Sequence, residues 1–138
     1  MTYTDTFIRV AEDCPVETGT VPVSSRPLSP AHVIQYELLA AAPYQYNHEE
    51  LLYEVHVRHK EVPEDERINR KSEIWGELFS KSHPCLRASM LPKRYGWGVH
   101  YNAEGKIALY AKESPEYDQF TSTEAGVTLL NAMCSKRR

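Results

Sequence analysis

The segment Ser82-His83-Pro84-Cys85 has the residue types that nucleophilic catalysis requires. In an extended chain His83 and Cys85 project to the same side, so the imidazole could draw the thiol toward the reactive thiolate. The sequence identifies no third group to orient the imidazole, although His100 is a second candidate base. The alternative is structural, with Cys85 as a small buried hydrophobic residue and His83 as the cap of the preceding helix.

Two histidines three positions apart, His56 and His59, would lie near one another on a helix and could supply two metal ligands. A third ligand would have to come from one of His100, Glu50 and Cys85. Beside Arg58 and Lys60, the two histidines are more ordinarily part of a solvated helix face. We therefore expect neither a metal ion nor a cofactor.

A predicted hairpin over residues 94–112 offers a candidate binding surface. A loop with Gly105 in the left-handed region pairs Tyr101 with Ile107 and fixes the register. One face is then apolar: Tyr95, Trp97, Val99, Tyr101, Ile107, Leu109 and Ala111. The opposite face could form a shallow floor for a ligand, with two arginines as charge anchors: Gly96, Gly98, His100, Tyr110 and Lys112, with Arg94 and Arg87. Alternatively, Tyr110 covers Gly98 as a cross-strand aromatic residue.

Basic and aromatic residues also alternate in Lys93-Arg94-Tyr95-Gly96-Trp97, as they do on surfaces that bind single-stranded nucleic acid. Further positive charge would come from Arg87 and from the C-terminal residues Lys136, Arg137 and Arg138. The predicted register, however, sends Tyr95 and Trp97 into the core, where no base could stack. We favour a basic strand edge that resists sheet-to-sheet pairing, which argues against a nucleic-acid partner.

The composition narrows the classes of protein to consider. The chain has 138 residues, a net charge of -3 and a pI near 6.1, which argues against general binding to polyanions. Its first ten residues do not resemble a secretory signal, and the longest aliphatic run, residues 38–42, is too short to cross a bilayer. Three cysteines do not form a disulfide framework. We expect a soluble cytoplasmic protein without membrane contact, either a monomer or a homodimer.

The elements that must position these residues begin with a short strand over residues 6–11. A Pro/Ser/Thr-rich loop follows over residues 16–29. Ser29-Pro30 then supplies an N-cap and a first helical position, and Pro43 ends the helix that starts there.

Two more helices are predicted in the middle of the chain. Asn47 and Glu50 resemble a capping box that opens a helix over residues 49–59, although the alternating apolar residues there would also suit a strand. A third helix opens at Pro63, ends before Pro84 and presents its apolar residues inward: Ile68, Trp75 and Leu78.

After the hairpin, Ser114-Pro115 starts a short helix, and residues 127–133 are predicted as a strand, with a helix as the alternative. A basic tail over residues 135–138 is expected to fray. This order predicts one α+β domain over residues 1–138, with an antiparallel sheet around the central hairpin and helices packed on one face.

Several segments together carry a resemblance to a known family. They are KRYGWGVHYNAEGKIALY over residues 93–110, Thr6 to Pro15, Pro43-Tyr44-Gln45-Tyr46, Cys85-Leu86-Arg87 and Ser135-Lys136-Arg137. In these the chain resembles small bacterial and fungal proteins of a domain-of-unknown-function family, DUF6157, over nearly its whole length. The resemblance implies a single domain and no particular activity. The family's ending has a basic residue where this chain has Cys134, which argues against a role for that cysteine.

The hairpin is also similar, more remotely, to the YdhG- and YjbR-like small α+β proteins, for some of which DNA binding has been suggested. From the residues themselves we expect a small binding or accessory module for a small anionic molecule or a peptide on the glycine-lined hairpin face. The alternatives are a cysteine-dependent enzyme that uses Cys85 with His83 or His100, and a nucleic-acid-binding module.

Overall fold

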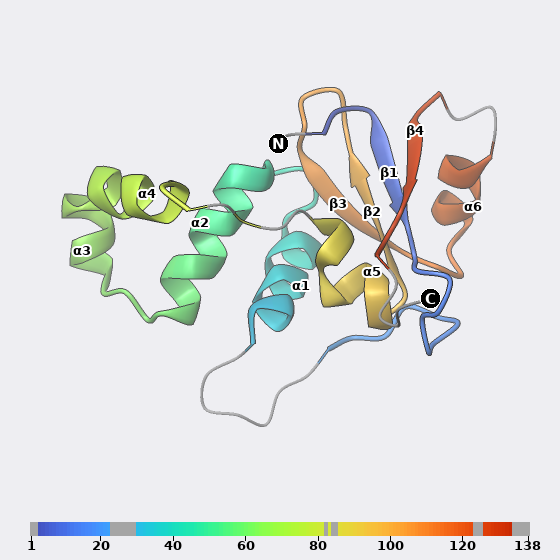
Figure 1. The fold of residues 1–138 in the computed structure, drawn as a ribbon, viewed down its shortest axis with the longest axis horizontal. Helices are drawn as coiled ribbons and strands as arrows, with labels where there is room; N and C mark the ends of the chain where they lie inside the picture. The colour runs from blue at the N-terminus through green and yellow to red at the C-terminus, as the bar shows by residue number, and fades with distance from the viewer. Residues whose placement is uncertain (1–2, 23–29, 82, 84–85, 123–125, 134–138) are drawn as a thin grey trace.

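The computed structural model describes residues 3–22, 30–81, 83, 86–122 and 126–133 (Figure 1). Four strands form one sheet in the order β3-β2-β1-β4. The strands are β1 (Thr6–Arg9), β2 (Trp97–Tyr101), β3 (Ile107–Ala111) and β4 (Thr128–Asn131). Together with the helices they make a single α+β domain, as the sequence predicts.

The central hairpin has the predicted register, with Tyr101 paired with Ile107 and Trp97 paired with Ala111. Gly105 has a φ of 79°, the left-handed conformation that the turn requires. The hairpin begins at Trp97 rather than near residue 94, because Met90–Arg94 forms the short helix α5. Tyr95 therefore follows a helix and lies outside the strand.

The sheet is mixed, whereas the sequence predicted an antiparallel one. Strand β4 runs parallel to β1, and the other neighbouring pairs are antiparallel. After β3 the chain must pass from one edge of the sheet to the other, and it does so through helix α6 (Pro115–Thr121). A crossover of this kind returns the chain in its original direction, so β4 is parallel to β3 and β1.

Helices lie on both faces of the sheet, not on one. Residues of β1 and the hairpin pack on one face against helices α1 (Ala31–Ala41) and α2 (His48–His59) in the main core: Ile8, Ile34, Leu38, Leu51, Val99, Tyr101 and Ile107. On the other face Phe7 of β1 packs against Tyr117 and Phe120 of α6. The short crossover helix thus covers the face of the sheet that was predicted to carry no helix.

Local signals placed most of the helix boundaries. Pro30 occupies the N-cap position of α1 rather than the predicted first helical position, and Ser29 lies outside the described residues. The predicted capping box of α2 is present, with Asn47 Oδ1 accepting from Glu50 N at 2.8 Å and Asn47 N donating to Glu50 Oε1 at 3.2 Å. The Ser114 side chain caps α6, as expected.

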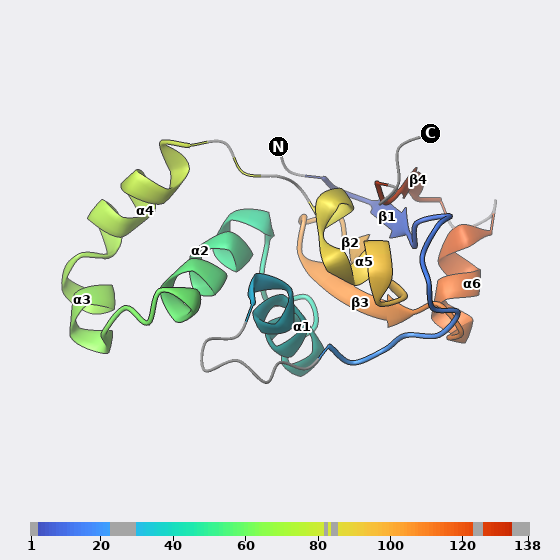
Figure 2. The ribbon, with the colours of Figure 1, turned by 60° about the horizontal axis from the view of Figure 1, so that its bottom comes forward.

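The predicted third helix is wrong in one respect. It divides at Arg70 into α3 (Glu64–Asn69) and α4 (Lys71–Phe79), and Ile68 is 72% exposed. The break changes the helical phase, so Ile74 and Leu78 of α4 are the buried residues. They pack on α2 against Tyr53 and Val57, and α3 and α4 form an arm beyond α2, away from the sheet (Figure 2).

A further short 3₁₀ turn, η1 (Leu86–Ala88), precedes α5 and contributes the buried Leu86. Residues 18–20 of the predicted loop lie along the hairpin, where Thr20 N donates to the carbonyl of Tyr95. Among the described residues, no helix has the length and apolar character needed to cross a membrane.

Candidate functional site

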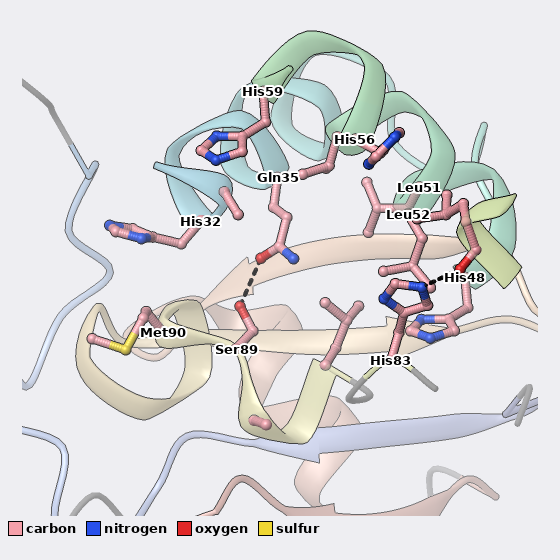
Figure 3. A pocket seen from close by; sticks show the side chains of 15 residues that line it. His32, Gln35, His48, Leu51, Leu52, His56, His59, His83, Ser89 and Met90 are labelled. Carbon is pink, nitrogen blue, oxygen red and sulfur yellow. Dashed lines mark hydrogen bonds between the residues drawn. The ribbon is translucent and has the colours of Figure 1, made fainter. Parts of the chain in front are cut away.

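A pocket of about 360 Å³ lies between α1, α2 and the segment that leads through η1 into α5 (Figure 3). Its polar lining consists of five histidines, an amide and a hydroxyl: His32, His48, His56, His59, His83, Gln35 and Ser89. Its apolar lining comes from small and branched residues: Ala31, Leu51, Leu52, Val55, Leu78, Leu86, Ala88 and Met90. Five of the six histidines in the chain therefore line a single pocket.

Helix α2 supplies three of these histidines, and the helical repeat places their side chains on the same side of the helix. His48, His56 and His59 recur with Leu52 at spacings of three or four residues, which places them on one side of the helix. Strand-like alternation in this segment is therefore not realised. Tyr53 and Val57, on another side of α2, pack against Ile74 and Leu78 of α4.

The opposite wall is held in place by a hydrogen bond between helices. Ser89 Oγ donates to Gln35 Oε1 at 2.8 Å, which ties the start of α5 to α1. The same hydroxyl accepts from Leu91 N at 3.2 Å and so caps α5. The Ser89 hydroxyl and the Gln35 amide oxygen are thus already engaged, which leaves the Gln35 amide nitrogen and the imidazoles as the other polar groups of the lining.

His83 has a defined tautomer in the neutral state. Its Nε2 lies 2.6 Å from the carbonyl oxygen of Leu78, and a carbonyl can only accept, so Nε2 is the donor. His83 therefore caps the end of α4, and its Nδ1 remains a hydrogen-bond acceptor. The ring also has an edge-to-face contact with Phe79 at 6.0 Å.

His48 is the most buried histidine of the pocket, with 6% of its surface exposed. Its Nδ1 is buried and has no hydrogen-bond partner among the described residues. Burial lowers the pKa of His48, and the neighbouring His83 lowers it further, while Glu49 acts in the opposite direction. We expect a neutral imidazole at pH 7.

The pKa values of His32 and His56 are also lowered. Burial lowers the pKa of each, and for His56 the neighbouring Lys60, His83 and His59 add to that effect. His83 lowers the pKa of both His48 and His56. A proton on one of them therefore opposes a proton on the next.

The lining has no formal counter-charge of its own. Of the described residues that line the pocket, none is Asp, Glu, Lys or Arg. Nor do any three His, Cys, Asp or Glu residues in the described part of the chain have an arrangement that could hold one metal ion. The pocket is thus an apolar cavity with five imidazoles, and no carboxylate, ammonium or guanidinium group, in its described lining.

The predicted glycine-lined hairpin face is covered rather than open. A Cβ atom added to Gly98 would lie 2.5 Å from Phe7 Cζ and 2.7 Å from Tyr117 Cε2, so α6 and β1 fill the space above it. A Cβ on Gly96, which has a φ of 76°, would lie 2.5 Å from the backbone oxygen of Thr18. Both glycines are explained by close packing.

His100 and Tyr110 do meet on this face, but through a third residue. The Tyr44 hydroxyl lies 2.8 Å from His100 Nδ1 and 2.7 Å from the Tyr110 hydroxyl. His100 is 8% exposed and stacks on Phe120 with ring centres 4.0 Å apart. This partly buried network joins the α1–α2 connection to the hairpin.

The charged residues predicted for the same site do not gather there. Arg87 Nε donates to the carbonyl of Asn131 at 2.8 Å and so supports β4. Arg94 is exposed at the end of α5, and Lys112 follows β3. The seven predicted ligand-binding residues therefore do not line one pocket.

The aromatic residues of the nucleic-acid hypothesis are also engaged. Tyr95 stacks on His32 with ring centres 5.2 Å apart, and Trp97 Nε1 donates to the Thr20 carbonyl at 2.8 Å. Lys93 lies within α5. Two predictions fall outside the described residues, the nucleophile Cys85 and the tail Lys136 to Arg138.

A family model described as a family of unknown function, DUF6157, matches residues 1–138. The chain belongs to this family. The resemblance seen in the sequence is thereby confirmed. A search of the curated proteins and a search of the solved structures found no match for this DUF6157 chain.

Sequence reasoning missed most of the pocket of this DUF6157 member. It singled out His56 and His59 as a pair, and His83 as a base, but gave no role to His32 or His48. The available signal was the continuation of the α2 stripe from His48 through His59. The contribution of α1 and of His83 to the same pocket is a tertiary feature without a local signal.

Proposed function

We propose that the protein is a small-molecule-binding module and that its ligand, an anion with an apolar body, occupies the histidine pocket. The observation that carries the proposal is the lining itself, five imidazoles on apolar walls with no carboxylate, ammonium or guanidinium group among the described lining residues. A concave, mostly apolar cavity with a few convergent polar groups is the usual form of a ligand site.

The size of the cavity suits a small molecule. A volume of about 360 Å³ corresponds to roughly a dozen water-sized groups at about 30 Å³ each. Leu52, Val55 and Met90 would contact the apolar part of such a ligand. The cavity is too small for an extended peptide, although a single peptide side chain would fit.

The charge of the ligand follows from the chemistry of imidazole. A cation would find no negative side chain in the described lining, and protonated histidines would repel it. An anion can acquire a partner, because an imidazole that takes up a proton becomes a hydrogen-bonding cation. The lowered pKa values of His48 and His56 keep this charge absent until an anion is present.

Thermal shift with three ligands of equal chain length tests the proposal: hexanoate, hexylamine and 1-hexanol at pH 6.5. A ligand that binds only the folded state raises the melting temperature in a concentration-dependent way. We expect hexanoate to raise it, 1-hexanol to do so less and hexylamine to leave it unchanged. A rise with Zn²⁺ or Ni²⁺ but not with hexanoate would replace the anion site by a metal site.

A pocket-filling variant locates the effect. Ala88→Leu adds a branched side chain to the lining, whereas Ala40→Leu adds the same atoms at an exposed position of α1. The hexanoate response should disappear in Ala88→Leu and persist in Ala40→Leu. An equal response in both variants would place the ligand elsewhere.

The geometry of His83 keeps one enzymatic alternative open for testing. Because Nε2 donates to Leu78, Nδ1 keeps the free lone pair with which His83 would act as a general base. Iodoacetamide should then alkylate Cys85 at neutral pH much faster than Cys14 and Cys134, and His83→Gln should remove the difference. Equal, slow alkylation of all three thiols would contradict this alternative.

A further inference from the structure

Gln35 presents a fixed hydrogen-bond donor to the histidine pocket. The Ser89 hydroxyl already accepts from Leu91 N, and it donates its own proton to Gln35 Oε1 at 2.8 Å. The side-chain amide is thereby held in one orientation, and its nitrogen, which can only donate, makes no hydrogen bond to any of the described residues. An acceptor on a ligand would therefore meet this nitrogen without rotation of the amide.

His83 presents the complementary group, a fixed acceptor. Its Nε2 donates to the Leu78 carbonyl at 2.6 Å, which leaves Nδ1 of the neutral ring with a lone pair and no hydrogen. Unlike Nδ1 of His48, neither this atom nor the Gln35 nitrogen is among the inaccessible, unpartnered polar atoms of the described residues. Figure 3 shows Gln35 and His83 on two sides of the same space, so both groups are open to a ligand in the pocket.

The two groups give the pocket an end for an acid and an end for a donor. A carboxylate only accepts hydrogen bonds, so it matches the Gln35 nitrogen and is mismatched with the lone pair of His83 Nδ1. His32 lies three residues before Gln35 on α1 and lines the same pocket, which places an imidazole beside the amide. The apolar lining, which includes Leu52 and Val55, suits a hydrocarbon chain that connects the two ends.

We infer that the ligand is a hydroxy acid whose hydroxyl group is separated from its carboxylate by an apolar chain. The inference rests on the proposed function of the pocket. The carboxylate accepts from the Gln35 amide nitrogen, and the hydroxyl donates to Nδ1 of His83. An ammonium group would also donate to Nδ1, but the described lining has no carboxylate to compensate its charge. The uncharged hydroxyl is therefore the donor that this lining favours.

Calorimetric titration at pH 7.0 with four acids of equal chain length tests the inference: hexanoate, 6-hydroxyhexanoate, 3-hydroxyhexanoate and 6-aminohexanoate. A hydroxyl that enters an apolar cavity without a partner weakens binding, so tighter binding requires an acceptor at the right place. We expect 6-hydroxyhexanoate to bind about two- to tenfold more tightly than hexanoate, the usual effect of one hydrogen bond. The other two acids should bind more weakly than hexanoate.

Gln35→Glu tests the end for the acid. The new side chain has the same shape and still accepts from Ser89, but a negatively charged oxygen replaces the donor nitrogen. Binding of hexanoate and 6-hydroxyhexanoate should be lost, whereas 1-hexanol, which has no acid group, should still bind. Gln45→Glu adds the same charge at an exposed position between α1 and α2 and is the control. Undiminished binding of hexanoate to Gln35→Glu would overturn the assignment of the acid end.

His83→Phe tests the end for the hydroxyl, because it keeps a ring beside Phe79 and removes both nitrogens. The preference for 6-hydroxyhexanoate over hexanoate should disappear, while the affinity for hexanoate should change little. Loss of the bond to Leu78 also removes a helix cap, so His83→Gln, whose amide both donates and accepts, is the second variant. It should retain part of the preference. A preference that persists in full in His83→Phe would overturn the assignment to His83.

The possible failures are distinct. If hexanoate binds the wild-type protein at least as tightly as 6-hydroxyhexanoate, the inference is overturned while the proposed function stands. Tighter binding of 3-hydroxyhexanoate would overturn the separation of the two groups, and tighter binding of 6-aminohexanoate would replace the hydroxyl by an ammonium group. If neither 1-hexanol nor any of the acids binds the wild-type protein, the proposed function fails together with the inference.

Discussion

The hydroxyl of Tyr44 lies 2.8 Å from Nδ1 of His100, and this contact joins the connection between α1 and α2 to the strand β2. Tyr44 reaches His100 around the edge of β3, where its own backbone N donates to the Ile107 carbonyl at 2.8 Å. Burial and the neighbouring Tyr110 raise the pKa of Tyr44, so the phenol stays protonated. Tyr44 of this network lies only four residues before His48, the first residue of α2 and a lining residue of the histidine pocket.

Removal of the Tyr44 hydroxyl should destabilise the protein. Tyr44→Phe leaves His100 Nδ1, on a residue that is 8% exposed, without its hydrogen bond. We expect a loss of about 1–3 kcal/mol in the free energy of unfolding, measured by urea denaturation. Tyr46→Phe removes a hydroxyl from a nearby, half-buried residue and is the control. Equal stability of Tyr44→Phe and wild type would show that the network is not structural.

Stability should fall as the solution becomes acidic. Burial lowers the pKa of His48 and of His100, although Asp5 partly offsets the effect at His100. In the unfolded chain each histidine has a pKa of about 6.5, so below that pH the unfolded state binds protons that the folded state excludes. The stabilisation is present in full above pH 6.5 and is lost as the pH falls toward the folded-state values.

Urea denaturation at pH 7.5 and pH 5.5 measures this dependence. Each buried histidine contributes up to about 1.4 kcal/mol per pH unit below pH 6.5. The variant His48→Gln, in which one titrating group is absent, should lose less stability than the wild type over the same range. An unfolding free energy that is constant or higher at pH 5.5 would contradict the burial of neutral imidazoles.

Gly98 should prove to be a packing residue. The added Cβ of Gly98→Ala would approach both Phe7 and Tyr117 to less than 3 Å, which forces β1 or α6 to move. We expect destabilisation of about 1–3 kcal/mol. Gly76→Ala, in α4 with nothing within 4 Å of the new Cβ, should instead stabilise by up to about 1 kcal/mol. If Gly98→Ala left stability unchanged but altered hexanoate binding, the result would indicate that hexanoate binds at the hairpin face.

The division of the arm into α3 and α4 can be tested with two isoleucines. Ile68 is 72% exposed and Ile74 is buried against α2. Ile68→Ala should change the free energy of unfolding by no more than about 0.5 kcal/mol, and Ile74→Ala should reduce it by about 2–4 kcal/mol. Comparable losses in both variants would favour one continuous helix with Ile68 inward.

Sequence reasoning succeeded where the determinants are local. The turn at Gly105 and the alternation on either side of it were sufficient for the register that pairs Tyr101 with Ile107. The capping box of Asn47 and Glu50 likewise placed α2. In each case the interacting groups are close in the sequence, so residue types and spacing determine the geometry.

It failed where distant segments decide the outcome. The covering of Gly98 by Tyr117 depends on the path of the crossover helix, and the parallel pairing of β4 depends on the same path. The pocket brings together His32 of α1, the α2 stripe, and His83 from the segment after α4. Only the stripe has a periodic signal, and it is equally typical of a solvated helix face.

The histidine pocket is the central claim, and the ring resonances of the histidines test it directly. Long-range ¹H–¹⁵N spectra of uniformly ¹⁵N-labelled protein would be recorded during titration with hexanoate at pH 7. We predict that the resonances of the pocket histidines shift, while His100, on the opposite face of the sheet, remains unchanged. Titration that leaves all five pocket histidines unchanged, or that moves His100 as much as any of them, would contradict the claim.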